Sequence, residues 1–196
     1  MLKQWSLKSV FDSHNYGVVI KSDVHECFSQ WLKKEFGISK VKIIDIGGGN
    51  GRVCLNIEEN IKDYLCLDLN PENIKTGIDF FRDKKNIRFE LFDTDSTEIS
   101  QNCDVVYIDS VLTMLENPFL TLRKMKKICK YIFINRVEFK SNLEKSNYKW
   151  GGMNEPSIFW SFSRTSFEDF CDENNFELSL INDISFVLKN NDYNND

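Results

Sequence analysis

The sequence predicts an α/β fold in which a mostly parallel sheet of seven strands is covered by helices on both faces. After an N-terminal extension, apolar strand-like segments alternate with amphipathic helix-like segments. Most of the strand-like segments are nearly continuous apolar runs, which is typical of strands buried on both faces. Strands are expected at 41–46, 64–69, 87–92, 104–108, 131–137, 176–182 and 184–188.

The starts of the helices are marked by capping residues. Two asparagines each precede a proline, and this order of N-cap and first helical residue is common at helix starts. Two other helices are expected behind capping boxes, in which an acid follows the cap by three residues. The two pairs with proline are Asn70-Pro71 and Asn117-Pro118, and the two capping boxes are Asp23 with Glu26 and Thr165 with Glu168.

The chain of 196 residues fits a single domain. Residues 1–40 are expected to form an N-terminal helical extension or lid, and residues 41–189 the ligand-binding domain. Residues 190–196 are polar and are expected to be a disordered tail. The segment 139–164 is expected to be a long loop, and such loops usually carry function.

The charge and the cysteines exclude several classes of protein. The net charge of −5 argues against nucleic-acid binding, which normally uses a basic surface. Six cysteines occur without a C-x-x-C pair, and two histidines stand at no familiar zinc spacing, so no metal site is expected. Neither a secretory segment nor an apolar run long enough for a membrane span is present, which predicts a reduced, cytoplasmic protein.

A glycine-rich loop follows the first predicted strand. Gly47, Gly49 and Gly51 come after Asp45 at alternate positions, whereas the dinucleotide pattern G-x-G-x-x-G would need glycine where Arg52 stands. A dinucleotide loop must cradle a pyrophosphate, but S-adenosylmethionine (SAM) has none and needs only close backbone approach. The spacing therefore indicates SAM rather than NAD.

The second predicted strand ends in Asp68. An acid at this place can accept hydrogen bonds from both hydroxyls of a ribose. Since such an acid would suit NAD equally well, the glycine spacing carries the distinction between the two cofactors. Taken alone, Asp68 could also be an ordinary strand-end or capping acid.

These motifs resemble, in order, those of the class I SAM-dependent methyltransferases, whose fold is Rossmann-like. Asp45–Gly51 resembles the first motif, Leu67-Asp68-Leu69 the ribose-binding acid, and Phe92-Asp93-Thr94 the acid that faces the adenine; Asp109 opens the motif after the fourth strand. The resemblance implies that the seventh strand is antiparallel and lies between the fifth and sixth. It also implies cofactor contacts from Asp45, Gly47, Gly48, Gly49, Asp68, Leu69, Asp93, Thr94 and Asp109.

Residues 108–139 look similar to a poorly characterised group of bacterial methyltransferases associated with surface-polysaccharide or other sugar-modifying genes. That resemblance implies a small-molecule acceptor, such as a sugar, nucleotide-sugar or phosphorylated metabolite. Many relatives have a histidine in the loop after the fourth strand, where this chain has Thr113-Met114. Its absence puts a base at this position in doubt.

Few residues remain as candidates for the chemistry. A hydroxyl acceptor benefits from a general base, and Asp109 could serve either as that base or as a cofactor contact. His14 could lie on a lid or be a lone surface histidine, and His25 is expected on the helix surface. Arg136 could hold a phosphate or carboxylate of the acceptor, or form an ordinary ion pair.

The leading function is therefore SAM-dependent methyl transfer to a small molecule, with an oxygen as the candidate acceptor atom. Two alternatives stay open at this point. One is a non-catalytic module that keeps the fold and binds SAM or a protein partner. The other is an NAD-dependent oxidoreductase, which the glycine spacing disfavours.

Overall fold

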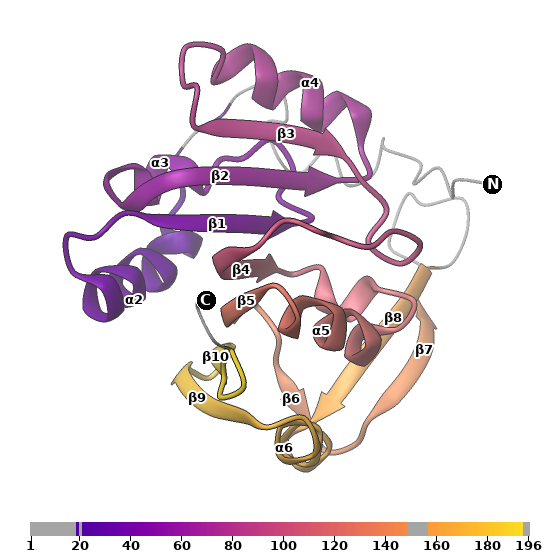
Figure 1. Cartoon of the computed structure of the whole chain (residues 1–196). Helices are drawn as coiled ribbons and strands as arrows, with labels where there is room; N and C mark the ends of the chain where they lie inside the picture. The colour runs from indigo at the N-terminus through magenta and orange to yellow at the C-terminus, as the bar shows by residue number, and fades with distance from the viewer. Residues whose placement is uncertain (1–18, 20, 149–156, 194–196) are drawn as a thin grey trace.

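A seven-stranded sheet forms the centre of the protein in a computed structural model that describes residues 19, 21–148 and 157–193 (Figure 1). The strand order is β3-β2-β1-β4-β5-β10-β9, with parallel pairing from β3 to β5. β10 runs antiparallel to both of its neighbours, as predicted. The strands are β1 (Val41–Ile46), β2 (Ile61–Asp68), β3 (Ile87–Leu91), β4 (Cys103–Asp109), β5 (Cys129–Asn135), β9 (Phe176–Asn182) and β10 (Ser185–Asn190).

Helices cover both faces of this sheet because successive residues of each strand point to opposite sides. Ile43 packs with Phe28 of α2 (Glu26–Phe36) and Ile57 of α3 (Cys54–Ile57). The adjacent Ile44 packs in a second cluster that includes Leu122 of α5 (Pro118–Lys126) and Phe167 of α6 (Arg164–Glu173). α4 (Pro71–Phe80) lies along β3 and β2, while α5 and α6 lie on the other face (Figure 1).

Two of the predicted helix caps are present and two are wrong. The side chain of Asn70 accepts a hydrogen bond from the Glu72 amide at 3.0 Å, and Asn117 caps α5 in the same way. α2 instead continues a 3₁₀ turn, η1 (Asp23–His25), and no side chain caps either element. α6 follows a strand directly, so its cap is the last residue of that strand, Ser163, and not Thr165.

The segment expected as a long loop contains a second sheet. β6 (Phe139–Lys140), β7 (Glu144–Tyr148) and β8 (Ser157–Ser163) pair in the order β6-β8-β7. Trp160 of β8 donates a hydrogen bond from Nε1 to the Leu115 carbonyl at 2.9 Å. This bond ties the small sheet to η3 (Leu112–Met114), the turn that follows β4.

The start of the expected tail is ordered. Asn190 belongs to β10, and its side chain donates to the carbonyls of Lys126 at 2.8 Å and Cys129 at 3.2 Å. Asp192 forms an ion pair with Lys126 at 2.5 Å. Residues 194–196 lie outside the described residues.

All six cysteines are free thiols. Over the described ranges, no group of histidine, cysteine or acidic side chains could hold a metal ion. The helices in this part of the chain are all too short or too polar to cross a membrane.

Candidate functional site

The glycine loop after β1 is tied to the end of β2. The amide of Gly47 donates to the Leu67 carbonyl at 2.7 Å, and the amide of Gly49 donates to Asp68 Oδ2 at 2.9 Å. Because β1 and β2 are parallel neighbours, their carboxyl ends meet at the same edge of the sheet. The loop and Asp68 therefore form one surface there.

Two glycines of this loop leave no room for a side chain. Gly47 has φ +68°, and a Cβ atom there would lie 2.2 Å from Val111 Cγ2. A Cβ atom on Gly48 would lie 2.4 Å from Asp45 Oδ2. The loop is thus pressed between the segment after β4 and the carboxyl group of Asp45, which brings its backbone close to any ligand above it.

Asp45 lies beneath this loop. Its side chain is buried and accepts a short hydrogen bond from the hydroxyl of Tyr64 at Oδ2, while Oδ1 has no partner. Burial raises the pKa of Asp45 to about 8, against the opposing effect of the Tyr64 hydrogen bond. In this structure the residue supports the loop from below.

Asp68 is held with its carboxylate open to a ligand. Oδ1 accepts from the Asn70 amide at 2.8 Å and Oδ2 from the Gly49 amide at 2.9 Å. Burial raises the pKa of Asp68, and these two backbone hydrogen bonds act against the rise. The side chain of Asn73 also donates a hydrogen bond to this carboxylate. An ionised carboxylate has about four acceptor positions, so one remains for a hydroxyl of a ribose. Leu69 beside it is exposed.

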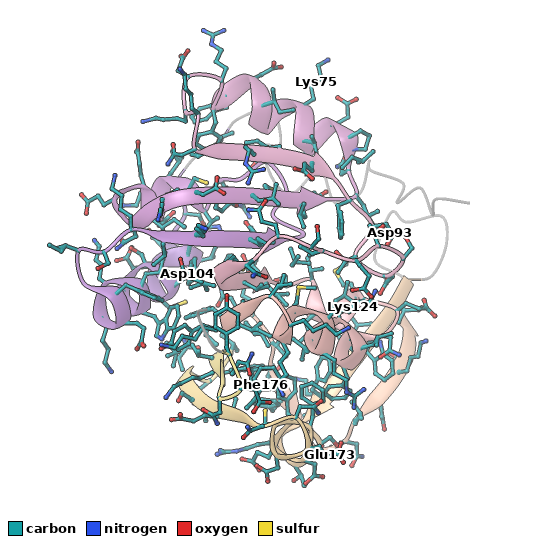
Figure 2. All side chains as sticks on the ribbon, in the orientation of Figure 1. Lys75, Asp93, Asp104, Lys124, Glu173 and Phe176 are labelled. Carbon is teal, nitrogen blue, oxygen red and sulfur yellow. The ribbon has the colours of Figure 1, made fainter. Side chains whose placement is uncertain are left out.

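Asp93 and Thr94 lie on the loop after β3. Figure 2 shows Asp93 on this loop and Lys124 on α5. Asp93 Oδ1 accepts from the Asp95 amide at 3.1 Å, and Lys124 Nζ donates to the carbonyl of the buried Thr94 at 3.4 Å. The Phe92 amide donates to the Asp68 carbonyl at 3.0 Å, which fixes this loop beside Asp68.

Asp109 and Arg136 form a bidentate ion pair at the ends of β4 and β5. Nε and Nη2 of the guanidinium lie 2.6 and 2.8 Å from the two carboxylate oxygens. Burial opposes the charge of Arg136, but the hydrogen bond and charge of Asp109 raise its pKa. Of the two roles predicted for Arg136, the structure shows the ion pair. Ser110 and Arg136 both have positive φ, 61° and 58°, a backbone strain typical of functional sites.

His25 is not on the helix surface, and that prediction is wrong. It ends η1, only 3% of it is exposed, and Nδ1 lies 3.0 Å from Tyr107 Oη and 3.4 Å from Asp109 Oδ2. Burial lowers the pKa of His25 to about 4; Arg52 and Arg136 act in the same direction, and Asp109 opposes them. The signal in the sequence was its spacing to Phe28 and Leu32, which places all three on one helical face.

The structure brings most of the predicted site residues to one edge of the sheet. The end of β2 is surrounded by Asp68, the glycine loop and the loop after β3. Asp109 lies at the end of β4, and Arg136 lies directly after β5. His14 lies outside the described residues. The remaining acceptor position of Asp68 and the tight glycine loop fit the ribose and the phosphate-free linkage of an adenosyl ligand.

Comparisons with known proteins agree with this geometry. The family described as "Methyltransferase domain" matches residues 14–180. No curated protein matches the chain by sequence.

Solved structures with the same fold cover nearly the whole chain. A SAM-dependent methyltransferase from Clostridium acetobutylicum has 11% identity and a TM-score of 0.66, over 92% of this chain and 96% of its own. SAM-bound CalS10, an amino pentose methyltransferase from Micromonospora echinaspora, has 12% identity and a TM-score of 0.65 over the same shares. The N-terminal domain of EvdMO1 with SAH bound has 13% identity and a TM-score of 0.67, over 87% of this chain and 82% of its own.

The family match spans most of the sequence, and the fold is shared with solved methyltransferases. The chain therefore belongs to the methyltransferase-domain family and is a class I SAM-dependent methyltransferase.

Proposed function

We propose that the chain transfers the methyl group of SAM to an oxygen of a small molecule, such as a sugar, nucleotide-sugar or phosphorylated metabolite. The proposal rests on a cluster of three polar side chains at the ends of β4 and β5. Asp109, Arg136 and His25 lie there, beside the glycine loop. Two structures with this fold support a sugar. CalS10 is an amino pentose methyltransferase, and EvdMO1 was crystallised in the presence of D-fucose.

In this proposal the cofactor lies across the ends of β1, β2 and β4. Asp68 accepts a hydrogen bond from a ribose hydroxyl, with Leu69 beside the adenosine, and Asp93 and Thr94 lie on the side of the adenine. The loop from Gly47 to Gly49, on its support Asp45, and Asp109 face the methionyl part. SAM supplies an electrophilic methyl group, so the chain mainly aligns the acceptor and excludes water.

The remaining expectations belong to the same proposal. Residues 41–189 form the SAM-binding unit, and residues 1–40 are an N-terminal extension that includes the candidate catalytic residue His14. The six free thiols support a reducing, cytoplasmic setting.

Calorimetric titration of Asp68→Ala tests the cofactor site. Removing a charge-assisted contact to the ribose should weaken SAM binding by roughly 1.5–3 kcal/mol, about ten- to a hundredfold in affinity. SAM, S-adenosylhomocysteine and NADH are titrated side by side, and binding of the two adenosyl ligands without NADH is expected.

Asp79→Ala is the matched control, because Asp79 is an exposed aspartate on α4. It should leave SAM affinity unchanged. Equal SAM affinity in folded Asp68→Ala and in the parent would refute the ribose assignment, and binding of NADH alone would overturn the function.

A further inference from the structure

His25 is the one buried histidine of the described chain, and only one of its ring nitrogens is paired. Nδ1 lies beside the carboxylate of Asp109 and the hydroxyl of Tyr107. Nε2 is buried and has no hydrogen-bond partner. A buried polar atom without a partner is costly, and native structures rarely keep one unless another molecule completes the bond.

We propose that His25 is the general base of this enzyme and accepts the proton of a hydroxyl acceptor at Nε2, while Asp109 orients the ring. The inference rests on the proposed function. The acceptor O–H bond breaks and its proton moves to Nε2, while the oxygen electron pair forms a bond to the methyl carbon. The S–CH₃ bond breaks, and its electron pair stays on sulfur, giving a methyl ether and S-adenosylhomocysteine. The imidazolium then loses its proton to solvent.

The polar groups around the ring favour a hydrogen on Nδ1. A carboxylate beside one imidazole nitrogen holds the hydrogen there and leaves the lone pair on the other. Asp109 Oδ2 takes this place at 3.4 Å. The Tyr107 oxygen also accepts from Asn135 Nδ2 at 3.2 Å, and Asn135 is fixed in turn by the Val24 carbonyl at 3.0 Å.

Burial, more than the surrounding charges, keeps His25 uncharged at neutral pH. Burial, Arg52 and Arg136 hold the pKa of His25 at about 4, well below neutral pH. Asp109 is the one group that favours the cation, so its carboxylate stabilises the imidazolium formed during the reaction. Because Nε2 is covered in the ligand-free chain, the acceptor must displace what lies over it.

Nuclear magnetic resonance on ¹⁵N-imidazole-labelled protein tests the tautomer without any acceptor. The chain has two histidines, so His25→Gln assigns the signals. At neutral pH we expect an uncharged His25 with its hydrogen on Nδ1 and Nε2 unprotonated. A hydrogen on Nε2, with Tyr107 donating to Nδ1, would leave no lone pair for the proton and would overturn the proposal, as would a cationic ring.

Methyl transfer from labelled SAM to D-fucose and D-glucosamine tests the role in turnover. His25→Gln should lower oxygen methylation by about 10²- to 10⁴-fold, the usual contribution of a general base. Transfer to an unprotonated amine, which needs no base, and SAM affinity should stay unchanged. Glu177→Gln, in an exposed ion pair on β9, is the control and should change neither rate.

The outcomes separate the two proposals. An equal loss of nitrogen methylation or of SAM affinity in His25→Gln would indicate a structural role and overturn the assignment of the base. Failure of the parent chain to bind SAM would instead contradict the proposed function. If the parent chain methylates neither sugar, the tautomer of His25 measured by nuclear magnetic resonance decides whether His25 can be the base.

Discussion

Asp45 lies one residue before the end of β1 and Asp68 ends the neighbouring β2, yet their surroundings give them different roles. Asp68 accepts hydrogen bonds from two backbone amides and from the Asn73 side chain, and one acceptor position remains for a ligand. Asp45 is buried against Gly48 and accepts a hydrogen bond from the Tyr64 hydroxyl. The first carboxylate is therefore suited to binding a ligand, and the second to holding the shape of the loop.

Gly48→Ala should damage this loop. The new methyl group would lie 2.4 Å from Asp45 Oδ2 and 2.7 Å from Cys66 Sγ, in a fully packed place. Overpacking of this kind costs about 1–3 kcal/mol, and the displaced loop should bind SAM more weakly. Urea unfolding and calorimetric titration with SAM measure the two effects.

Gly37→Ala provides the control. Gly37 has φ +62°, but a Cβ atom there meets nothing within 4 Å. Because ψ is −123°, a conformation that residues other than glycine rarely adopt, this change should cost about 1–3 kcal/mol of stability through backbone strain alone and leave SAM affinity intact. If Gly48→Ala bound SAM like the parent, the loop would not be the tight cradle described above.

Single residues show where sequence reasoning succeeds and where it stops. Asp68 and the glycines could be predicted because their function depends on a local spacing. The pairing of His25 with Asp109 joins residues distant in the sequence, and only the packing of α2 on β4 brings them together. Val24, the residue before His25, is apolar but 40% exposed, whereas His25 is buried. Hydrophobicity alone therefore does not identify the buried face of this turn.

At the scale of elements, helix starts are predictable when cap and helix are contiguous. Asn70 and Asn117 cap the expected helices because the N-cap hydrogen bond spans only two or three residues. The small sheet of β6, β7 and β8 was missed because strand pairing depends on distant partners. Its pairing of Phe139 with Phe162 leaves no trace in either local sequence.

Asn70→Ala should destabilise α4 and the protein by about 1 kcal/mol, since an orphan amide at the helix start loses its acceptor. Thermal or urea unfolding measures the loss. Asn70→Asp keeps an acceptor at the cap and a negative charge at the helix N-terminus, so it should retain the parent's stability. Equal stability of Asn70→Ala and Asn70→Asp would show that the cap contributes nothing.

At the scale of the whole molecule, the alternation of strands and helices predicted the sheet and its two covered faces. The place of the antiparallel β10 between β5 and β9 followed from the resemblance to known methyltransferases, since alternation alone does not place the terminal hairpin. The start of the expected tail, Asn190 to Tyr193, could not be predicted because its hydrogen bonds run to β4, α5 and β5. Polar composition alone suggested disorder there.

Two buried groups should shape the pH dependence of the global stability. The folded pKa of Asp45, about 8, is above its ordinary value of 3.8, so its contribution to stability is lost as pH rises towards 8. The folded pKa of His25, about 4, is below 6.5, so its contribution is lost as pH falls towards 4. Between about pH 6.5 and 8, Asp45 alone of these two titrates.

Asp45→Asn should therefore remove a decline in the unfolding free energy over that range, a decline of at most about 1.4 kcal/mol per pH unit. Urea unfolding of parent and variant at several pH values between about 6.5 and 8 measures the difference. Parallel profiles for the two proteins would show that Asp45 is ionised in the folded state.

The position of β10 has a consequence for how the protein is made. The ribosome delivers β5 and β9 before β10, yet β10 ends up between them. Until β10 is synthesised, the edge of β5 has unpaired backbone groups. Residues that are buried in the folded protein, such as Phe133 and Ile134, then remain exposed. A chain that stops before residue 185 would lack β10 and leave this edge of β5 exposed, so we expect such a truncated chain to aggregate.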